Sequence, residues 1–388
     1  MKTVPIDRAA AHQRARALLS TLARPSRAED ALRKAAAYGT ALSSFVENRR
    51  RARAGREDLL PLYFVWTVSR HCNFLCEYCD DHRGRRYPEL PREGELDTAA
   101  ARDVLAVMRT RCPSVYFAGG EPTLRDDLPE LASEARALRY FPIVLNTNGS
   151  AIVKRLHHPG FSTLLRDLDL VVVSLDALDP TVLSTMWGYP RPADVLWAIH
   201  VLAELRGPLR FRLMVNCVVQ PGRVAHARAV LDFARELGIG FAPVPVNVGP
   251  AVDATLADDP EYADFVELVL ARKREGQVIA GSERMLERLL SSTPLTCRNT
   301  LKPHIDHDGK LFWPCKASVA VEPVTLDVRD FAHVDALWAH AAAAIDPRGF
   351  SSRCGARCNW AQNYTTDAYA HGLVEPLSLL REVRGFVA

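Results

Sequence analysis

The sequence lacks three features that would place it in a specialised class of protein. It has no apolar run long enough to span a bilayer, and residues 1–20 are too polar and too arginine-rich for the core of a secretory signal. Neither sign of charge dominates, since 49 basic and 46 acidic residues give a formal net charge of +3. It shows no internal repeat and no low-complexity tract. We expect a cytoplasmic globular protein that binds no nucleic acid.

Cysteine is scarce but strongly clustered. The chain has 388 residues and nine cysteines, of which three lie within eight residues and four lie in the last quarter of the sequence. In a cytoplasmic protein, thiols serve metal or redox chemistry more often than disulfides. The other two, Cys112 and Cys217, lie in or beside apolar runs, where an inert buried cysteine is the usual state.

Short apolar runs rich in Val, Ile, Leu and Phe alternate with helix-like segments between residues 59 and 250. This alternation predicts an α/β fold of parallel βαβ units with right-handed crossovers, which either close partway into a barrel or form an open sheet. The predicted strands are residues 62–68, 114–117, 143–145, 170–175, 210–219 and 240–246. The predicted helices are residues 97–110, 128–138, 194–205 and 224–237.

Three further segments flank this core. Residues 1–58 are predicted to be a basic helical segment, in which residues 31–46 have helical spacing and lead into the arginine-rich stretch 49–56. We interpret it as a solvated helix face followed by a linker; the alternative is a basic amphipathic helix, within residues 30–56, on an anionic membrane or acidic partner. Residues 251–296 are predicted to be connecting helices. Residues 297–388 are predicted to form a small cysteine-rich α+β extension with a hairpin at 305–312, around Asp308-Gly309.

The first cysteine cluster has the spacing Cys72-x3-Cys76-x2-Cys79. Thiolates are the usual ligands of iron–sulfur clusters, and three of them leave one iron of a four-iron cluster without a protein ligand. An open metal position is typical of a catalytic site. The alternative is a zinc knuckle with His71 or Asp80 as the fourth ligand.

This spacing, with the aromatic Tyr78 before the last cysteine at the end of a first strand, resembles the signature of the radical S-adenosylmethionine (radical SAM) superfamily. The resemblance implies a partial (β/α)6 barrel of the TIM type. It also implies that S-adenosylmethionine chelates the open iron and is cleaved by one electron to a 5′-deoxyadenosyl radical, which abstracts hydrogen from the substrate. In such enzymes the residue at the position of Tyr78 packs by the adenine.

Polar residues follow the predicted strands at their carboxyl ends, where parallel sheets build their sites, although each one alone also fits a strand-end turn. Gly119-Gly120-Glu121-Pro122 resembles the Gly-Gly-Glu motif that binds the amino group of the cofactor, and the glycines permit close backbone approach to a ligand. By the same resemblance, Ser174 is the candidate for the carboxylate or ribose, with Asp176 near it and Arg191 as a carboxylate partner in a run that departs from the family pattern. The remaining strand-end candidates are Asn146, Asn216 and Asn247.

The second cysteine set can form either a zinc site or a second four-iron cluster. It comprises Cys297, Cys315, Cys354 and Cys358, and it resembles the shortened SPASM, or twitch, extension that binds one auxiliary cluster. The final Cys-x3-Cys pair is one residue longer than the frequent Cys-x2-Cys. We interpret the nearby His304 and His307 as turn residues. Asp80, Asp81, His82 and Arg83, which follow the first cluster, face either substrate or solvent.

The sequence therefore predicts a radical SAM enzyme that dehydrogenates, epimerises or rearranges a small molecule, with a one-electron donor such as flavodoxin or ferredoxin. Peptide-modifying and lipid-modifying radical SAM enzymes are the alternatives within the family. A non-catalytic zinc-binding interaction module is the alternative from another class. No catalytic side chain is assigned.

Overall fold

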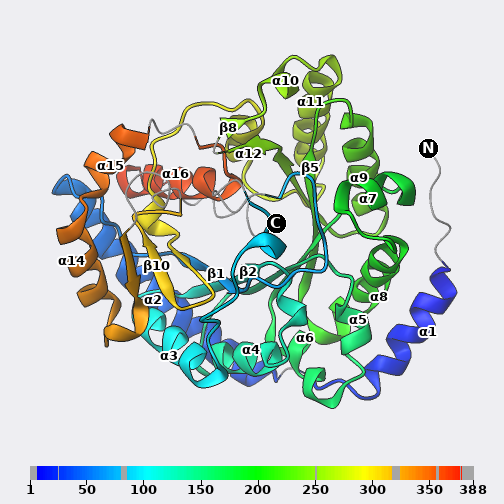
Figure 1. Ribbon diagram of the computed structural model, residues 1–388, viewed down its shortest axis with the longest axis horizontal. Coiled ribbons are helices and arrows are strands. Elements are labelled where there is room, and N and C mark those ends of the chain that lie inside the picture. Colours follow the sequence, from blue (N-terminus) through cyan, green and yellow to red (C-terminus); the bar gives the residue numbers. More distant parts are fainter. Residues whose placement is uncertain are drawn as a thin grey trace.

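The computed structural model describes residues 7–24, 26–79, 85–249, 251–316, 324–354, 358–375 and 377. Its main sheet has nine strands in the order β11-β10-β9-β1-β2-β3-β4-β5-β6 (Figure 1). The first six along the chain are parallel to one another. They are β1 Tyr63–Ser69, β2 Ser114–Gly119, β3 Ile143–Thr147, β4 Leu170–Ser174, β5 Arg212–Val219 and β6 Gly240–Pro245. The α/β prediction is confirmed, and the six strands form an open partial barrel.

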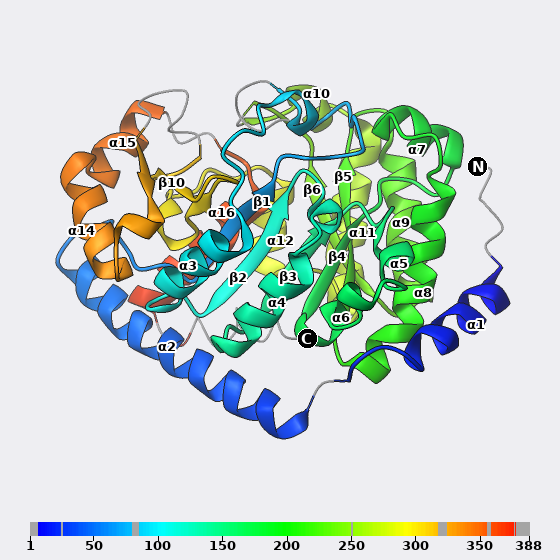
Figure 2. The ribbon, with the colours of Figure 1, turned by 60° about the horizontal axis from the view of Figure 1, so that its bottom comes forward.

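Helices link these strands and cover the outer face of the sheet (Figures 1 and 2). Asp97 caps α3, because its side chain accepts a hydrogen bond from Ala100 N, and Gly238 ends the crossover from α9 with a φ of +60°. The four predicted helices are confirmed to within a few residues. The crossover helices are α3 Thr98–Arg109, α4 Leu128–Ala137, α5 Ile152–Arg155, α6 Leu164–Asp167, α7 Pro180–Trp187, α8 Ala193–Leu209 and α9 Val224–Glu236.

Two N-terminal helices belong to the same packed unit. α1 Arg8–Leu19 lies against α8, and the long α2 Arg27–Arg53 crosses the edge of the sheet where the strands begin (Figure 2). Asn48 of α2 both donates to Leu60 O (3.0 Å) and accepts from Leu60 N (2.6 Å), just before β1. Ser44 donates to Arg111 O before β2, and Arg33 donates to Tyr140 O before β3. α2 therefore closes the amino-terminal end of the barrel.

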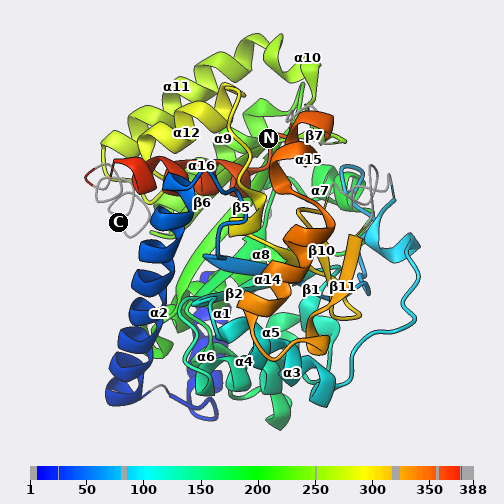
Figure 3. The same cartoon turned by 90° about the vertical axis from the view of Figure 1, so that its left-hand side faces the viewer.

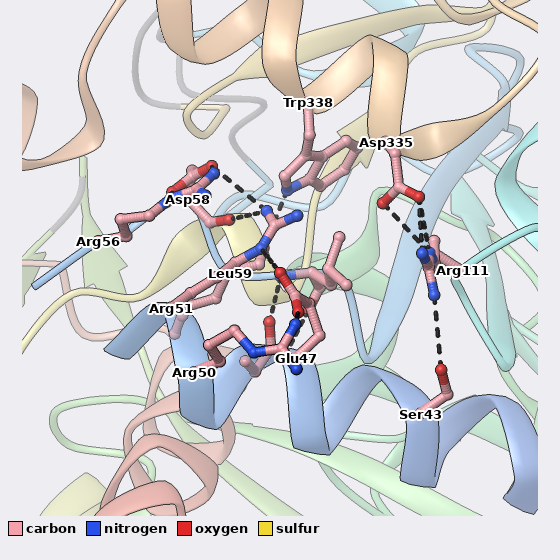
Figure 4. Close-up of polar contacts among 12 residues, drawn as sticks. Ser43, Glu47, Arg50, Arg51, Arg56, Asp58, Leu59, Arg111, Asp335 and Trp338 are labelled. Atoms are coloured by element: carbon pink, nitrogen blue, oxygen red, sulfur yellow. Dashed lines mark hydrogen bonds and ion pairs between the residues drawn. The ribbon is translucent and has the colours of Figure 1, made fainter. Parts of the chain in front are cut away.

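The interpretation of residues 31–56 as a solvated face and a linker is wrong in part. α2 runs through to Arg53, so most of the arginine-rich stretch is helical. Arg51 is buried and donates to Glu47 and Asp58, and Arg56 also pairs with Asp58 (Figure 4). These arginines are held by the protein's own carboxylates. Among the helices described, none has the length and apolar character of a membrane span.

The C-terminal part extends the same sheet. β9 His304–Ile305 pairs in parallel with β1, and β10 Lys310–Trp313 runs back antiparallel to it, with β11 Val324–Asp327 outside. The predicted hairpin at 305–312 is confirmed. The reading of His304 as a turn residue is wrong, because it lies in β9, whereas His307 does lie in the turn. The division of the chain into segments 1–58, 59–250, 251–296 and 297–388 stays a prediction.

Further helices follow β6 among the described residues: α11 packs against α9 and α12, α12 also against α16, and α14 against β11. Trp338 of α14 donates from Nε1 to Leu59 O (2.9 Å), and α14 is also tied to Arg111 by Asp335 (Figure 4). α16 lies beside the end of α2, where the rings of Phe45 and Tyr369 meet at 5.9 Å (Figure 3). The helices are α10 Ala254–Ala257, α11 Pro260–Arg274, α12 Glu283–Leu290, α14 Val334–Ala344, α15 Pro347–Cys354 and α16 Ala361–Val374.

Candidate active site

The first cysteine loop leaves the carboxyl end of β1 and is clamped onto α7. Leu75 N donates to Trp187 O (2.8 Å), and Glu77 N donates to Met186 O (3.0 Å). Gly188, which ends α7 with a φ of +55°, lets the loop pack closely, since a Cβ there would lie 3.0 Å from Cβ of Leu75. These contacts hold the backbone of the loop against α7.

The sulfur atoms of this loop fit an iron–sulfur cluster. Phe74 N lies 3.4 Å from Cys72 Sγ and donates to it. Burial raises the pKa of the Cys72 thiol to about 12 and that of Cys76 still further, and each is raised also by the charge of Cys79. Thiols that are buried together and oppose each other's ionisation become good ligands when a multivalent cation offsets their charge. His71 is exposed, and Asp80, Asp81, His82 and Arg83 lie outside the described residues.

Gly119 and Gly120 bring β2 against the backbone of the cysteine loop. Gly120 N donates to Ser69 O (2.9 Å) and Glu121 N donates to His71 O (2.6 Å). A Cβ on Gly119 would lie 2.4 Å from Ser69 O, and one on Gly120 would lie 2.3 Å from His71 O. The two glycines therefore allow the end of β2 to approach the backbone of the cysteine loop.

The Glu121 carboxylate is fully buried and joins the ends of two strands. Its Oε1 accepts from Thr123 N (2.9 Å), from Thr123 Oγ1 and from Thr147 Oγ1 (2.6 Å), and its Oε2 accepts from Asn148 N (2.5 Å). Burial raises the pKa of Glu121, while these hydrogen bonds act in the opposite direction. The carboxylate orients the loop beyond β3 in addition to any contact with a ligand.

Asp176 is likewise buried and fully engaged. It accepts hydrogen bonds from Tyr78 Oη (2.5 Å), Trp187 Nε1 (2.7 Å) and Val218 N (2.7 Å). The aromatic side chain expected beside adenine is therefore anchored at its hydroxyl to the residues after β4. Burial raises the pKa of Asp176, and the hydrogen bond from Tyr78 opposes that shift.

Strand register places three predicted residues on the concave face of the sheet. Ser174 of β4 is paired with Asn216 of β5, and Asn146 of β3 is paired with Val172, two residues before Ser174 on the same face. All three polar side chains are half-buried, whereas Cys217, on the opposite face of β5, is fully buried. The structure thus brings Asn146, Ser174 and Asn216 together in the lumen of the partial barrel.

Two predicted site residues lie apart from this group. Arg191 is exposed before α8 and pairs with Asp194 at 3.4 Å. Asn247 lies beyond β6 in the two-residue strand β7 Asn247–Val248, which pairs with β8 Ala251–Val252, and it donates to Asn359 O (3.4 Å). Cys112 and Cys217 are both fully buried, in agreement with an inert role.

The second cysteine set lies at the opposite end of β1 from the first. Cys315 follows β10, which ends level with the beginning of β1, and Cys297 precedes Leu301, whose carbonyl accepts from Leu62 N just before β1 (2.8 Å). Cys297 and Cys315 line one small cavity. Cys354 is the last residue of α15.

A buried donor beside these cysteines suits a cluster with sulfur acceptors. Asn359 Nδ2, adjacent in sequence to Cys358, is buried with no hydrogen-bond partner among the described residues. Orphaned buried polar groups are costly unless a ligand or ion satisfies them. Hydrogen bonds to cluster sulfur are a recognised way to tune an iron–sulfur centre.

Sequence reasoning missed Lys302. Its side chain is 1% exposed, between Cys297 and Cys315 in the sequence. Its Nζ lies 3.5 Å from His304 Nε2 and 4.8 Å from the centre of the Trp360 ring. Burial lowers the pKa of Lys302 to about 8, against the charges of the neighbouring cysteines. No pattern in the sequence distinguishes it from a surface lysine.

The structure places a loop with three cysteines above the strand ends of a partial α/β barrel. The Radical SAM superfamily matches this chain over residues 66–234. A probable GTP 3',8-cyclase of Methanococcus maripaludis is 28% identical over 265 residues, which is 65% of this chain and 84% of that protein. Pre-heme d1 synthase of Dinoroseobacter shibae is 34% identical over 122 residues, 30% of this chain and 27% of that protein.

Solved structures show the same fold at low sequence identity. Streptococcus suis SuiB bound to S-adenosylmethionine aligns with a TM-score of 0.53 and 19% identity, over 72% of this chain and 64% of SuiB. The enzyme anSMEcpe with bound AdoMet aligns with a TM-score of 0.51 and 19% identity, over 70% of this chain and 79% of that chain. The protein belongs to the radical SAM superfamily and is a radical SAM enzyme, which uses a [4Fe–4S] cluster, S-adenosylmethionine and a reductant.

Proposed function

We propose that this enzyme takes a hydrogen atom from a small polar molecule held in the barrel lumen, with the catalytic cluster on Cys72, Cys76 and Cys79. The observation that carries the proposal is the group of lumen-facing side chains of Asn146, Ser174 and Asn216. Amide and hydroxyl groups converging in a concave site are typical of recognition of small polar ligands.

The open side of the barrel is crossed by the C-terminal part of the chain. Trp360 packs against His304 of β9 with ring centres 6.0 Å apart, and its neighbour Asn359 accepts from Asn247 beyond β6. This segment therefore bridges the two edges of the six-stranded barrel. It favours an enclosed substrate of limited size over an extended peptide, and it excludes water from the reacting carbon.

When bound, the cluster and S-adenosylmethionine supply a 5′-deoxyadenosyl radical. The backbone around Gly119 and Gly120, the polar groups of Ser174 and Asn216, and the ring of Tyr78 would hold that cofactor. Glu121 and Asp176 keep these groups in place, because both carboxylates bridge separate strand ends. Dehydrogenation, epimerisation and rearrangement of the substrate are all compatible with this arrangement.

The second cysteine set binds an auxiliary [4Fe–4S] cluster in this proposal, with Cys297, Cys315, Cys354 and Cys358 as ligands. Four thiolates leave no open iron, so its part is in one-electron transfer rather than in chelation of the substrate. The two cysteine sets lie at opposite ends of β1, and the lumen lies between them. Flavodoxin or ferredoxin in the cytoplasm would supply the initial electron.

The substrate class is tested by tracing hydrogen into 5′-deoxyadenosine. Reconstituted enzyme is incubated anaerobically with dithionite, S-adenosylmethionine and one of three fractions of a fully deuterated cell extract: small molecules, peptides or lipids. Ribose-deuterated GTP is tested alongside, because relatives carry the name GTP 3',8-cyclase. Deuterium in 5′-deoxyadenosine is expected from the small-molecule fraction. Labelling from only the peptide or lipid fraction would refute the proposed class.

A pair of variants on adjacent residues of β5 provides the control. Asn216→Ala removes an amide from the lumen, and we expect it to reduce the labelling at least tenfold, the loss of roughly one hydrogen bond to substrate or cofactor. Cys217→Ala changes the opposite, buried face of the same strand. It is expected to leave labelling of folded enzyme close to that of the wild type.

A further inference from the structure

Lys302 is a buried lysine that has no carboxylate partner among the described residues. It follows the short 3-10 turn Asn299–Leu301, and its side chain is 1% exposed. Within the described part of the chain, its close contacts are His304 Nε2 at 3.5 Å and the face of Trp360 at 4.8 Å, and no Asp or Glu forms an ion pair with it. Lys316, by contrast, donates to Tyr87 Oη at 2.8 Å.

Such a position is costly for an ammonium group unless an anion compensates it. A lysine removed from water without a partner loses much of its hydration energy, and contact with a ring face returns only a small part of it. Trp360, whose ring Lys302 contacts, follows Cys358 by two residues. The charges of Cys315, Cys297 and Cys358 raise the pKa of Lys302 and oppose the effect of burial. A four-iron cluster with four thiolate ligands carries net negative charge, which would supply the missing compensation.

We propose that Lys302 is the counter-cation of the auxiliary cluster and raises the reduction potential of that cluster. This inference rests on the proposed auxiliary cluster. A fixed positive charge stabilises the more negative, reduced state of a neighbouring centre more than its oxidised state. Because Lys302 and Trp360 exclude water, solvent screens this interaction little. Lys302 is thus a positioning residue that acts through the cluster.

The test measures the potential of the auxiliary cluster alone. In full-length protein with Cys72, Cys76 and Cys79 all changed to Ala, the remaining cluster is titrated by EPR against potential. Lys302→Gln and Lys302→Met remove the charge, and the midpoint is expected to move to a more negative value in both. Lys302→Arg keeps the charge and is expected to retain a midpoint near that of the parent. Two neutral variants are used so that, if one of them folds poorly, the other still tests the proposal.

Lys273→Met provides a matched control, because Lys273 is a half-buried lysine on α11 that donates to Ile279 O (2.7 Å) away from the cysteine sets. Its midpoint should equal that of the parent. Equal midpoints in the parent, Lys302→Gln and Lys302→Met would overturn the role of Lys302 while leaving the auxiliary cluster in place. Absence of iron from the parent triple variant would instead overturn the auxiliary cluster itself, and the inference with it.

Discussion

Tyr78 Oη donates a hydrogen bond to Asp176 Oδ2 over 2.5 Å, and this contact joins the cysteine loop to the end of β4. The tyrosine precedes the last cysteine of the loop, and the aspartate follows Ser174 by two residues. One buried contact therefore sets the distance between the thiolates and the polar side chains of the lumen.

Tyr78→Phe and Asp176→Asn are each expected to lower the free energy of unfolding by about 1–3 kcal/mol, because each leaves a buried polar group short of a partner. The two changes remove the same contact, so the double variant should cost less than the sum of the single ones. Urea denaturation of the four proteins in a double-mutant cycle measures the difference. Strict additivity would show that the contact contributes nothing.

Gly120→Ala should abolish cofactor cleavage and reduce iron retention, because the new Cβ would lie 2.3 Å from His71 O in the cysteine loop. Iron content and 5′-deoxyadenosine yield are the measurements. Gly207→Ala is the matched control, since no atom lies within 4 Å of a Cβ there and the site is within α8. It should retain full iron and gain up to about 1 kcal/mol of stability. Equal iron in both variants would refute the packing argument.

Arg33→Met should destabilise the protein by about 3–5 kcal/mol, because it leaves Asp169 without its buried ion-pair partner. Arg33 is 3% exposed and donates to both oxygens of Asp169, at 2.6 and 2.7 Å, and to Asp30 at 2.5 Å. Urea denaturation of the apoprotein measures the loss. Arg50→Met, which removes an exposed pair with Glu47, should change stability by less than about 1 kcal/mol. A similar loss in both variants would contradict the bracing role of α2.

The ion pair between Arg33 and Asp30 predicts that the free energy of unfolding depends on pH. Burial alone would raise the pKa of Asp30, but Arg33 and Lys34 lower it to about 2 from its ordinary 3.8. A lowered folded-state pKa gives stability that is present above pH 3.8 and is lost as the pH falls towards 2. In Arg33→Met this acid-dependent loss should be smaller. An unchanged slope of unfolding free energy between those pH values would exclude Arg33 as the cause.

Cys354→Ala should lower the iron content of reconstituted protein by roughly half and leave binding of S-adenosylmethionine intact, if each cysteine set holds one four-iron cluster. Inductively coupled plasma analysis counts iron and zinc in the same sample. Zinc in place of iron at the second cysteine set would favour the alternative that these cysteines form a zinc site. An iron content equal to that of the wild type would remove Cys354 from the ligand set.

The barrel was predictable because its signal is local. β4 is buried on both faces over Val171, Val172 and Val173 and reads as a continuous apolar run, and a helix stop such as Gly238 depends on its own backbone conformation. The attachment of β9 to β1 was not predictable, since a pairing between residues about 240 positions apart leaves no trace in either short segment. The packing of α2 across the starts of the strands was not predicted for a related reason. Arg33 and Asn48 are polar residues of the kind found on surfaces, and their partners are distant in sequence.

The candidate site divides in the same way. The spacing of Cys72, Cys76 and Cys79 predicts a ligand set from sequence alone, because the three residues share one loop. Glu121 and Asp176 accept hydrogen bonds from residues on or after other strands. Those donors are distant in sequence, so the sequence suggested only contacts with a ligand. Lys302 was invisible, because only its burial beside the cysteine set distinguishes it.

The central claim is that the loop of Cys72, Cys76 and Cys79 holds the cluster that cleaves S-adenosylmethionine. It is tested most directly by reducing anaerobically reconstituted protein with dithionite and quantifying 5′-deoxyadenosine and methionine by mass spectrometry. Wild-type protein should form the two products in equal amounts, and Cys76→Ala should form neither. Cleavage by Cys76→Ala at the wild-type rate would contradict the account.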